Sequence, residues 1–188
     1  MDYKKYYYLE KYIFNEVNSA FYKRGFLSAE EFFCIIIWKA NRAKSNIAKR
    51  LKKKNPNLDL QTIVKKLTNN LHKKKTPKER LMYLFDEWGF RLSMASAILT
   101  VLFPNDFTIY DVRVCNMLGK YHNISNKTKK DVVWNEYVKF IKDVKNEAKN
   151  EKTLRDKDKW LWGKSFIEDL EKNIKAEFNI TSISDNSR

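Results

Sequence analysis

Hydrophobic residues recur at helical spacing along almost the whole chain. In the first 24 residues, Tyr8, Tyr12, Val17 and Phe21 fall on one helical face, and Gly25 follows them. Apolar residues three or four positions apart predict an amphipathic helix. The same spacing predicts helices over residues 28–42, 44–54, 59–75, 76–88, 94–103, 111–119, 128–150 and 155–178. Strand-like alternation extends nowhere over a useful length, and only residues 107–110 are expected to be extended, so the sequence predicts an all-α fold.

Two of the predicted helices begin with a capping box. Ser28 is followed three residues later by Glu31, and Thr76 is followed by Pro77 and Glu79. In this motif the hydroxyl and the carboxylate each accept a hydrogen bond from the other residue's backbone N–H. Proline also suits the first position of a helix. We therefore expect helices to start directly after Ser28 and Thr76.

Positive charge is concentrated in one segment. The chain carries 38 Lys and Arg against 23 Asp and Glu, a formal net charge of +15. Residues 39–80 contain 15 basic residues and only two acidic ones, Asp59 and Glu79, and so hold +13 of that excess. This segment predicts a docking surface for a polyanion, such as nucleic acid or an acidic membrane.

The cysteines and the N-terminus narrow the class of protein. Cys34 and Cys115 lie in apolar surroundings with no His or Cys partner nearby in sequence. We therefore expect no metal site, iron–sulfur cluster or disulfide. The N-terminus has no apolar run typical of a signal peptide, and no stretch of 18 apolar residues occurs. These features predict a soluble, intracellular protein without a membrane partner, located in the cytoplasm and associated with the nucleoid.

The most informative stretch runs from Trp88 to Gly119. Residues 88–100 read WGFRLSMASAILT, and residues 107–119 read FTIYDVRVCNMLG. They predict a helix end, a tight hairpin at Gly89, a helix of small residues, a loop, and Asp111 at the start of a further helix. This order resembles the helix-hairpin-helix DNA glycosylase superfamily, which includes endonuclease III, adenine DNA glycosylase and 8-oxoguanine DNA glycosylase. The resemblance covers about residues 80–120, and the flanking pattern is nearest to that of adenine glycosylases.

The resemblance implies a role for Asp111. In that superfamily the catalytic aspartate follows the residue that opens the second hairpin helix by 18 positions, and Ser93 and Asp111 have this separation. Cleavage of an N-glycosidic bond builds positive charge on the deoxyribose, and a fixed carboxylate stabilises that charge and orients or deprotonates a water. The chemistry needs no metal or other cofactor. An ordinary helix N-cap is the alternative role for Asp111, and the two roles are compatible.

The resemblance also implies an organisation for the chain. Residues 1–178 form one glycosylase-like helical bundle, with room for two helical lobes flanking a cleft. This unit comprises the basic helical segment 39–80, the helix-hairpin-helix and catalytic region 77–120, and the C-terminal helices 128–178. We expect residues 179–188 to form a frayed tail. Glycosylases of this type commonly act as monomers, so a monomer is expected.

In the family the hairpin aims backbone N–H groups at a DNA phosphate beside a helix N-terminus. The implied DNA-binding residues are Gly89, Phe90, Arg91, Ser93, Met94 and, in the basic segment, Arg42. Phe90 or Met94 is a candidate wedge that fills the gap left by a flipped base. A solvated basic face is the alternative for Arg42. Ser93 is expected to cap the second hairpin helix, and Ser96 to permit close helix packing.

A flipped base also needs an aromatic-lined pocket. The candidate pocket residues are Trp38, Lys39, Tyr110, Trp160 and Trp162. For the tryptophans, packing in the core or at the rim of a groove is the alternative.

The chain departs from the family pattern in the hairpin and at the lyase position. It keeps Gly89 and Phe90 but has Trp88 and Arg91 where a proline and a second glycine are usual. Bifunctional members carry a lysine where this chain has Ser93, so we expect a monofunctional enzyme that leaves an abasic site. The chain has 30 lysines in all, so a nucleophile at another position stays open.

Three functions fit the sequence. The first is a DNA glycosylase that flips a damaged or modified base out of duplex DNA and hydrolyses its glycosidic bond, in base excision repair or in removal of modified foreign bases. The second is a non-catalytic double-stranded DNA-binding protein on a glycosylase scaffold, which the altered hairpin favours. An RNA-binding or RNA-modifying role fits the charge equally well but does not fit the motif.

Overall fold

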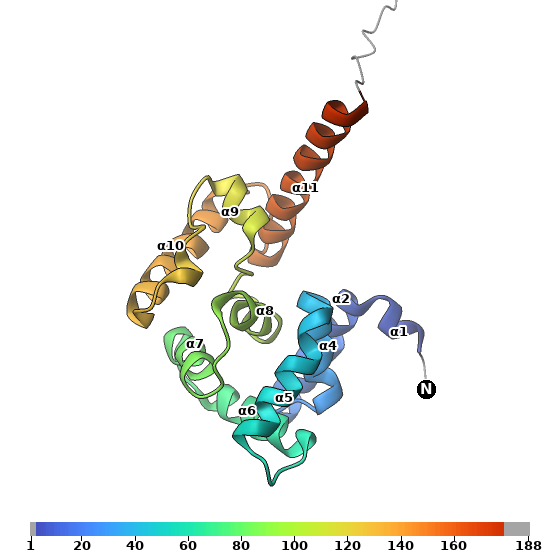
Figure 1. Cartoon of the computed structure of the whole chain (residues 1–188), viewed down its shortest axis with the longest axis vertical. Coiled ribbons are helices and arrows are strands. Elements are labelled where there is room, and N and C mark those ends of the chain that lie inside the picture. Colours follow the sequence, from blue (N-terminus) through green and yellow to red (C-terminus); the bar gives the residue numbers. More distant parts are fainter. Residues whose placement is uncertain (1–2, 179–188) are drawn as a thin grey trace, which may run out of the picture.

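A computed structural model describes residues 3–178 of the chain (Figure 1). Within this range every regular element is helical and no strand occurs, which confirms the predicted all-α fold. The elements are α1 (Lys4–Tyr7), α2 (Leu9–Tyr12), the π-helical turn η1 (Ile13–Val17), α3 (Asn18–Arg24), α4 (Ala29–Ala40), the 3₁₀ turn η2 (Asn41–Ala43), α5 (Lys44–Lys54), α6 (Leu60–Lys73), α7 (Pro77–Asp86), α8 (Leu92–Leu102), α9 (Val112–Leu118), the 3₁₀ turn η3 (Ile124–Asn126), α10 (Lys130–Glu147) and α11 (Leu154–Phe178).

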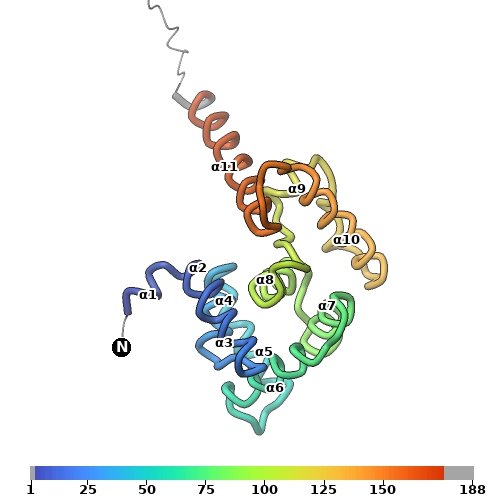
Figure 2. The backbone as a smooth tube through the Cα atoms, turned by 180° about the vertical axis from the view of Figure 1, so that it is seen from behind, coloured from blue at the N-terminus to red at the C-terminus, as the bar shows by residue number. Residues whose placement is uncertain are grey.

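Helix α8 lies at the centre of the molecule, in contact with α3, α4 and α7 (Figure 1). Helices α4, α5 and α6 pack together on one side of it, and α9, α10 and α11 pack together at the opposite end (Figure 2). The chain passes from α8 to the second group through residues 103–111. This connection carries Asp111, so the predicted catalytic residue lies where the two groups of helices meet.

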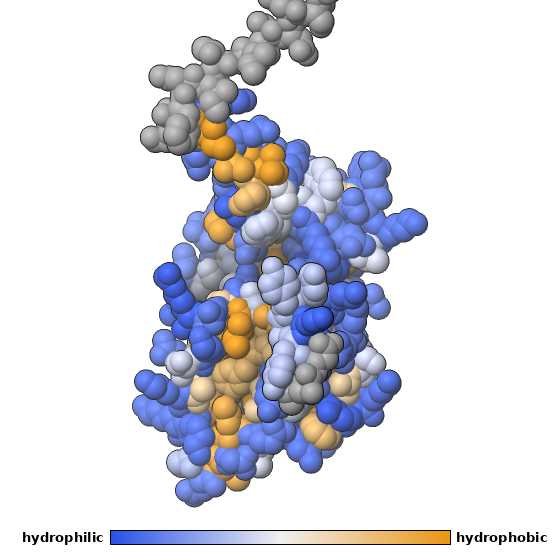
Figure 3. Space-filling model, turned by 90° about the vertical axis from the view of Figure 1, so that its right-hand side faces the viewer, coloured by the Kyte–Doolittle hydropathy of each residue, from blue (hydrophilic) through white to orange (hydrophobic). Residues whose placement is uncertain are grey.

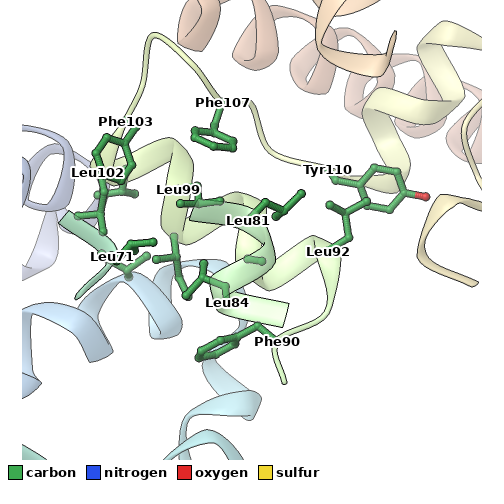
Figure 4. Packing of buried hydrophobic residues seen from close by; sticks show 14 of the residues in the cluster. Leu71, Leu81, Leu84, Phe90, Leu92, Leu99, Leu102, Phe103, Phe107 and Tyr110 are labelled. Atoms are coloured by element: carbon green, nitrogen blue, oxygen red, sulfur yellow. The ribbon is translucent and has the colours of Figure 1, made fainter. Parts of the chain in front are cut away.

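The central position of α8 follows from its composition. Every residue from Ala95 to Leu102 is buried, and a helix that is apolar nearly all round must be covered on all sides. Figure 4 shows Leu81 and Leu84 of α7 close to Leu99 of α8, with Phe90 below them. This core continues into α10 through Tyr137 and its neighbours. The hairpin and the Asp111 connection are therefore attached to the same hydrophobic core.

Both predicted capping boxes are formed. The hydroxyl of Ser28 accepts a hydrogen bond from Glu31 N–H at 3.2 Å, and the carboxylate of Glu31 accepts one from Ser28 N–H at 2.8 Å. Thr76 and Glu79 make the equivalent pair of bonds, at 3.2 and 2.9 Å. Helices α4 and α7 accordingly start at the predicted residues, Ala29 and Pro77.

The first predicted helix is interrupted. Tyr8 separates α1 from α2 with a non-helical backbone (φ −95°, ψ 54°). From Leu9 the chain runs through η1 into α3, which ends at Gly25 as predicted, with a φ of 75°. No residue of α1 is buried, and a short helix without a buried face has little to stabilise it.

The last helix is less buried than its apolar residues suggest. Leu161 lies in the core, whereas Phe166, Ile167 and Leu170 are exposed. Helix α11 projects away from the rest of the molecule in Figure 1, and Figure 3 shows hydrophobic side chains gathered on this upper part. Val132 of α10, which the periodicity places inward, is also exposed.

Three further predictions concern the chain as a whole. Within residues 3–178, no helix is both long enough and apolar enough to cross a bilayer. Cys34 is partly buried and Cys115 is buried, and both are free thiols. The predicted frayed tail, residues 179–188, lies outside the described residues.

Candidate functional site

Asp111 stands where an extended segment gives way to a helix. Residues 107–110 carry no regular structure, and Asp111 is the N-cap of α9. Its Oδ1 accepts a hydrogen bond from the backbone N–H of Arg113 at 3.1 Å. The predicted capping role is confirmed, and it fixes the carboxylate at the start of the helix.

The backbone in front of Asp111 is held by two buried hydroxyl groups. The Oγ of Ser96, in α8, accepts a hydrogen bond from the N–H of Tyr110 at 2.9 Å and donates one to the carbonyl of Ser93 at 3.1 Å. The hydroxyl of Tyr137, in α10, donates to the carbonyl of Thr108. Ser96 was predicted only to permit close packing, and it also anchors the residue next to Asp111.

Lys39 lies directly against Asp111. Its Nζ, near the C-terminal end of α4, is 2.6 Å from Oδ2 of Asp111, and the two side chains are only 14% and 22% exposed. Burial raises the pKa of Asp111, but the charge and hydrogen bond of Lys39 and the N–H of Arg113 outweigh it, so the pKa lies below its ordinary value. The carboxylate is therefore ionised at neutral pH.

This ion pair lines a cleft of about 1160 Å³. The cleft lies between the N-terminal helices and the end of α4 on one side and the first turns of α11 on the other. Its aromatic lining residues are Tyr7, Tyr8, Phe14, Trp38 and Trp162. Stacking on aromatic rings is the usual way in which proteins hold an unstacked base. The cleft therefore combines an ionised carboxylate with surfaces suited to a planar ring.

Arg155 connects the two sides of the cleft. Its Nη2 lies 2.9 Å from Oε1 of Glu10 in α2, and its Nη1 donates to the carboxylate of Asp158 in α11. The guanidinium also lies over the rings of Phe14 and Trp38, 4.9 and 5.3 Å from their centroids. A planar guanidinium suits such combined stacking and bidentate contacts. Arg155 thus fixes the orientation of Trp38, beside Lys39.

Asp158 is a second carboxyl group in the cleft, and its environment differs from that of Asp111. It is only 2% exposed. Burial raises its pKa to about 6, although Arg155 and Lys39 act in the opposite direction. One carboxyl group with a lowered pKa and another with a raised pKa is the pattern by which a single site provides both a carboxylate and an acid.

The predicted pocket residues divide into two groups. Trp38, Lys39 and Trp162 line the cleft with Asp111. The prediction is wrong for Tyr110, which is buried and donates its hydroxyl to the carbonyl of Tyr121 at 2.7 Å. Successive residues of an extended segment point to opposite sides, so Ile109 and Asp111 face the cleft while Tyr110 faces the core.

The prediction is also wrong for Trp160. It is 42% exposed and has the ammonium of Lys164 over its ring at 5.3 Å, outside the cleft. Arg155, Asp158, Lys159 and Trp162 line the cleft because they share one face of α11, at spacings of three, four and seven residues. Trp160 lies off that face. Helical spacing within the predicted helix 155–178 was the available signal for Arg155 and Asp158, to which sequence reasoning assigned no role.

The hairpin does not present its backbone N–H groups as predicted for phosphate binding. Gly89 has a φ of 63°, its N–H donates to the carbonyl of Phe85, and the N–H of Phe90 donates to that of Leu84. The first bond closes α7 in an αL C-cap turn with Gly89 in the left-handed region, and the two bonds occupy the N–H groups predicted to meet a phosphate. Phe90 is only 4% exposed and lies edge-on to Phe32. Its assignment as a DNA-contacting wedge is therefore wrong.

The capping prediction for Ser93 is also wrong. Helix α8 begins at Leu92, and its N-cap residue is Arg91, which makes no side-chain capping bond. The turn at Gly89 brings the chain into the helix two residues earlier than predicted, at Leu92 instead of Met94. Arg91 is exposed, and Ser93 and Met94 are half-buried on the first turn of α8. Among the predicted hairpin contacts, these three side chains are accessible to a ligand.

The basic segment lies against the hairpin. In α5, Nη1 of Arg50 donates to the carbonyl of Gly89 at 3.0 Å, and its guanidinium lies 4.8 Å from the centroid of the Phe90 ring. Lys54 lies over the ring of Trp88 at 5.6 Å. Arg42, in η2, is exposed three residues after Lys39. The basic surface of α5 therefore runs along the hairpin, and η2 joins it to the residue paired with Asp111.

Comparison of the chain with protein-family models, with curated proteins and with solved structures returns no match. The cleft, the charge around it and the spacing of the chain's own residues are therefore the observations that bear on function.

Proposed function

We propose that the protein is a DNA glycosylase that takes a damaged or modified base from duplex DNA into the cleft and hydrolyses its N-glycosidic bond. The observation that carries the proposal is the ionised, half-buried Asp111 in an aromatic-lined cleft. It stands 18 positions after Ser93, the separation typical of the helix-hairpin-helix glycosylases that residues 80–120 resemble. The partner is double-stranded DNA, and the protein acts as a monomer.

The chemistry assigns Asp111 two tasks. As the bond to the base breaks, positive charge develops on the deoxyribose ring, and a fixed carboxylate beside the anomeric carbon lowers the energy of that state. Asp111 is held in place at both oxygens, by Arg113 N–H and by Lys39, so it needs no reorganisation when the charge appears. The same carboxylate orients or deprotonates the attacking water.

The surroundings of the cleft fit a polyanionic substrate. Trp38 and Trp162 offer ring faces to a flipped base, in the cleft that contains Asp111. Arg42, Arg50 and Arg91 contribute positive charge along η2, α5 and the start of α8, where phosphates of the duplex would lie. On this proposal the basic segment supplies affinity, and the cleft supplies the chemistry.

A panel of duplex oligonucleotides, each with one damaged base or one modified cytosine, tests the proposal. Base release is detected as strand breakage after alkali treatment. We expect the wild type to act on at least one duplex, and Asp111→Asn to lose about 10²–10³-fold in single-turnover rate while it still binds DNA. Asp131→Asn, an exposed acid on α10 that pairs with Lys78, is the matched control and should keep full activity. Equal rates for Asp111→Asn and the wild type would overturn the assignment.

A second candidate is a non-catalytic protein that binds double-stranded DNA. The structure of the hairpin favours it, because Phe90 is buried and the N–H groups of Gly89 and Phe90 are bonded within the turn. This candidate predicts binding that weakens steeply with salt, and no base release from any duplex. The ionised carboxylate in the cleft favours the enzyme.

A further inference from the structure

The carboxylate of Asp111 contacts a lysine from a different part of the fold. Lys39 comes from α4, 72 residues before Asp111, and its Nζ is 2.6 Å from Oδ2. Both residues line the cleft. If Asp111 acts beside the anomeric carbon of the deoxyribose, as the proposed function requires, the amine of Lys39 lies within reach of the same carbon.

Base release changes the chemistry of that carbon. The product is an abasic deoxyribose, whose ring-opened form carries an aldehyde at C1′. A lysine amine beside an aldehyde forms a Schiff base. The amine must first lose a proton, and the carboxylate of Asp111 is the group placed to accept it.

We propose that Lys39 is the nucleophile of an abasic-site lyase activity in this cleft. The ammonium of Lys39 passes a proton to Asp111, and the free amine attacks C1′ of the abasic sugar to form a carbinolamine. Asp111 returns the proton to the departing hydroxyl, water leaves, and a protonated imine joins Lys39 to the sugar. This inference rests on the proposed function, and it replaces the expectation, drawn from Ser93, of an enzyme that stops at the abasic site.

The imine then permits strand cleavage without any further reactant. The Asp111 carboxylate takes a proton from C2′, the electrons of that C–H bond form a double bond, and the C3′–O bond breaks. The 3′ phosphate leaves as the 5′-phosphorylated end of the downstream strand. Water hydrolyses the imine, which releases an unsaturated aldehyde on the upstream strand and regenerates the lysine. No oxidant, reductant or metal enters this sequence.

The geometry distinguishes Lys39 from the other lysines of the cleft. The Nζ of Lys159, in α11, lies 3.0 Å from Oε1 of Glu10, in α2, and the side chain of Lys159 is 51% exposed. Lys11 is exposed to solvent. Lys39 combines a covered side chain with direct contact to Asp111. The position that carries the lysine in bifunctional family members is occupied here by Ser93, whose carbonyl holds the hydroxyl of Ser96.

A duplex with a preformed abasic site tests the proposal independently of base recognition. The site is made in advance by excision of uracil, so the assay does not depend on which base the protein releases. The full-length protein is incubated with this duplex with and without sodium borohydride, which reduces the imine to a stable amine. We expect the wild type to nick the strand by β-elimination, to form a covalent adduct, and to carry that adduct on Lys39 in peptide mapping by mass spectrometry.

Lys39→Arg is the decisive variant, because it keeps the charge beside Asp111 and the net charge of the protein but cannot form an imine. We expect its trapped adduct to fall to the level of the enzyme-free control. Lys145→Arg, an exposed position on α10, should be trapped like the wild type. The proposal is overturned if the wild type is not trapped, if Lys39→Arg is trapped as well as the wild type, or if the adduct maps to another lysine. Trapping on Lys39 by a protein that releases no base from any duplex would support the lyase and reject the glycosylase.

Discussion

The hairpin and the cleft differ in how well the sequence pattern indicates which residues a ligand can reach. The hairpin, residues 89–94, belongs to the stretch that resembles the glycosylase superfamily, yet Phe90 is buried beneath Arg50 and the N–H groups of the turn are bonded within it. The cleft has no contiguous motif, yet it brings together Lys39, Asp111, Arg155 and Asp158 from three parts of the chain. The local motif here fixes the path of the backbone, and the residues to which we assign the chemistry are ones that only the fold brings together.

The largest effect that we expect is on stability, from a substitution in the hairpin, and it tests whether Phe90 is a structural residue. Phe90→Ala removes a ring that is only 4% exposed and packs against Phe32, so we expect the free energy of unfolding to fall by about 3–5 kcal/mol. Urea denaturation measures the change. Arg91→Ala, the exposed neighbour, should leave stability within about 0.5 kcal/mol of the wild type. Unchanged stability for Phe90→Ala would restore the wedge interpretation.

The second effect concerns the buried carboxyl group of the cleft. Burial raises the pKa of Asp158 to about 6, against an ordinary value of 3.8 for the unfolded chain. Between these values the folded state binds the extra proton, so this group's contribution to stability is complete below about pH 4 and is lost as the pH rises through 6. The loss amounts to about 3 kcal/mol.

Asp158→Asn cannot titrate and isolates this effect. We expect the stability of the wild type minus that of Asp158→Asn to decrease between pH 4 and pH 7, as measured by urea unfolding at each pH. An increase over the same range would mean that the ion pair with Arg155, and not burial, sets the state of this carboxyl group.

The smallest effect distinguishes the two serines of α8. Ser96→Ala leaves the buried N–H of Tyr110 without its acceptor, so we expect a loss of about 1–3 kcal/mol in stability and slower base release. Ser93→Ala should change stability by less than about 0.5 kcal/mol. A helix cap at Ser93 would instead cost about 1 kcal/mol. Thermal unfolding of both variants decides which serine positions Asp111. Equal losses of stability in Ser96→Ala and Ser93→Ala would contradict the assignment of this role to Ser96.

Much of the fold could be predicted from the sequence, because it depends on local interactions. The capping boxes at Ser28 and Thr76, the bounds of the helix over residues 44–54 and the N-cap role of Asp111 each involve residues within a few positions of one another. The break at Tyr8 was missed because the tyrosine-rich start has helical periodicity but packs against little.

The site could be predicted only in part. Trp38, Lys39, Asp111 and Trp162 were each candidates, but their convergence depends on how α4 and α11 pack around the connection after α8. Tyr110 was misplaced because neighbouring residues of an extended segment point to opposite sides, so the residue next to Asp111 faces the core and not the cleft. Arg155 and Asp158 share a helical face with Trp162, but nothing in the spacing shows that this face lines the cleft until α11 is placed against α2 and α4.

The proposed function requires Asp111 to promote hydrolysis of an N-glycosidic bond in this cleft. Mass spectrometry of the small molecules released from diverse damaged and modified duplex DNAs tests it most directly, with wild type and Asp111→Asn compared at equal DNA occupancy. We expect a free base from at least one DNA with the wild type, and none above background with Asp111→Asn. No free base from any DNA with the wild type, or the same yield from both proteins, would contradict it.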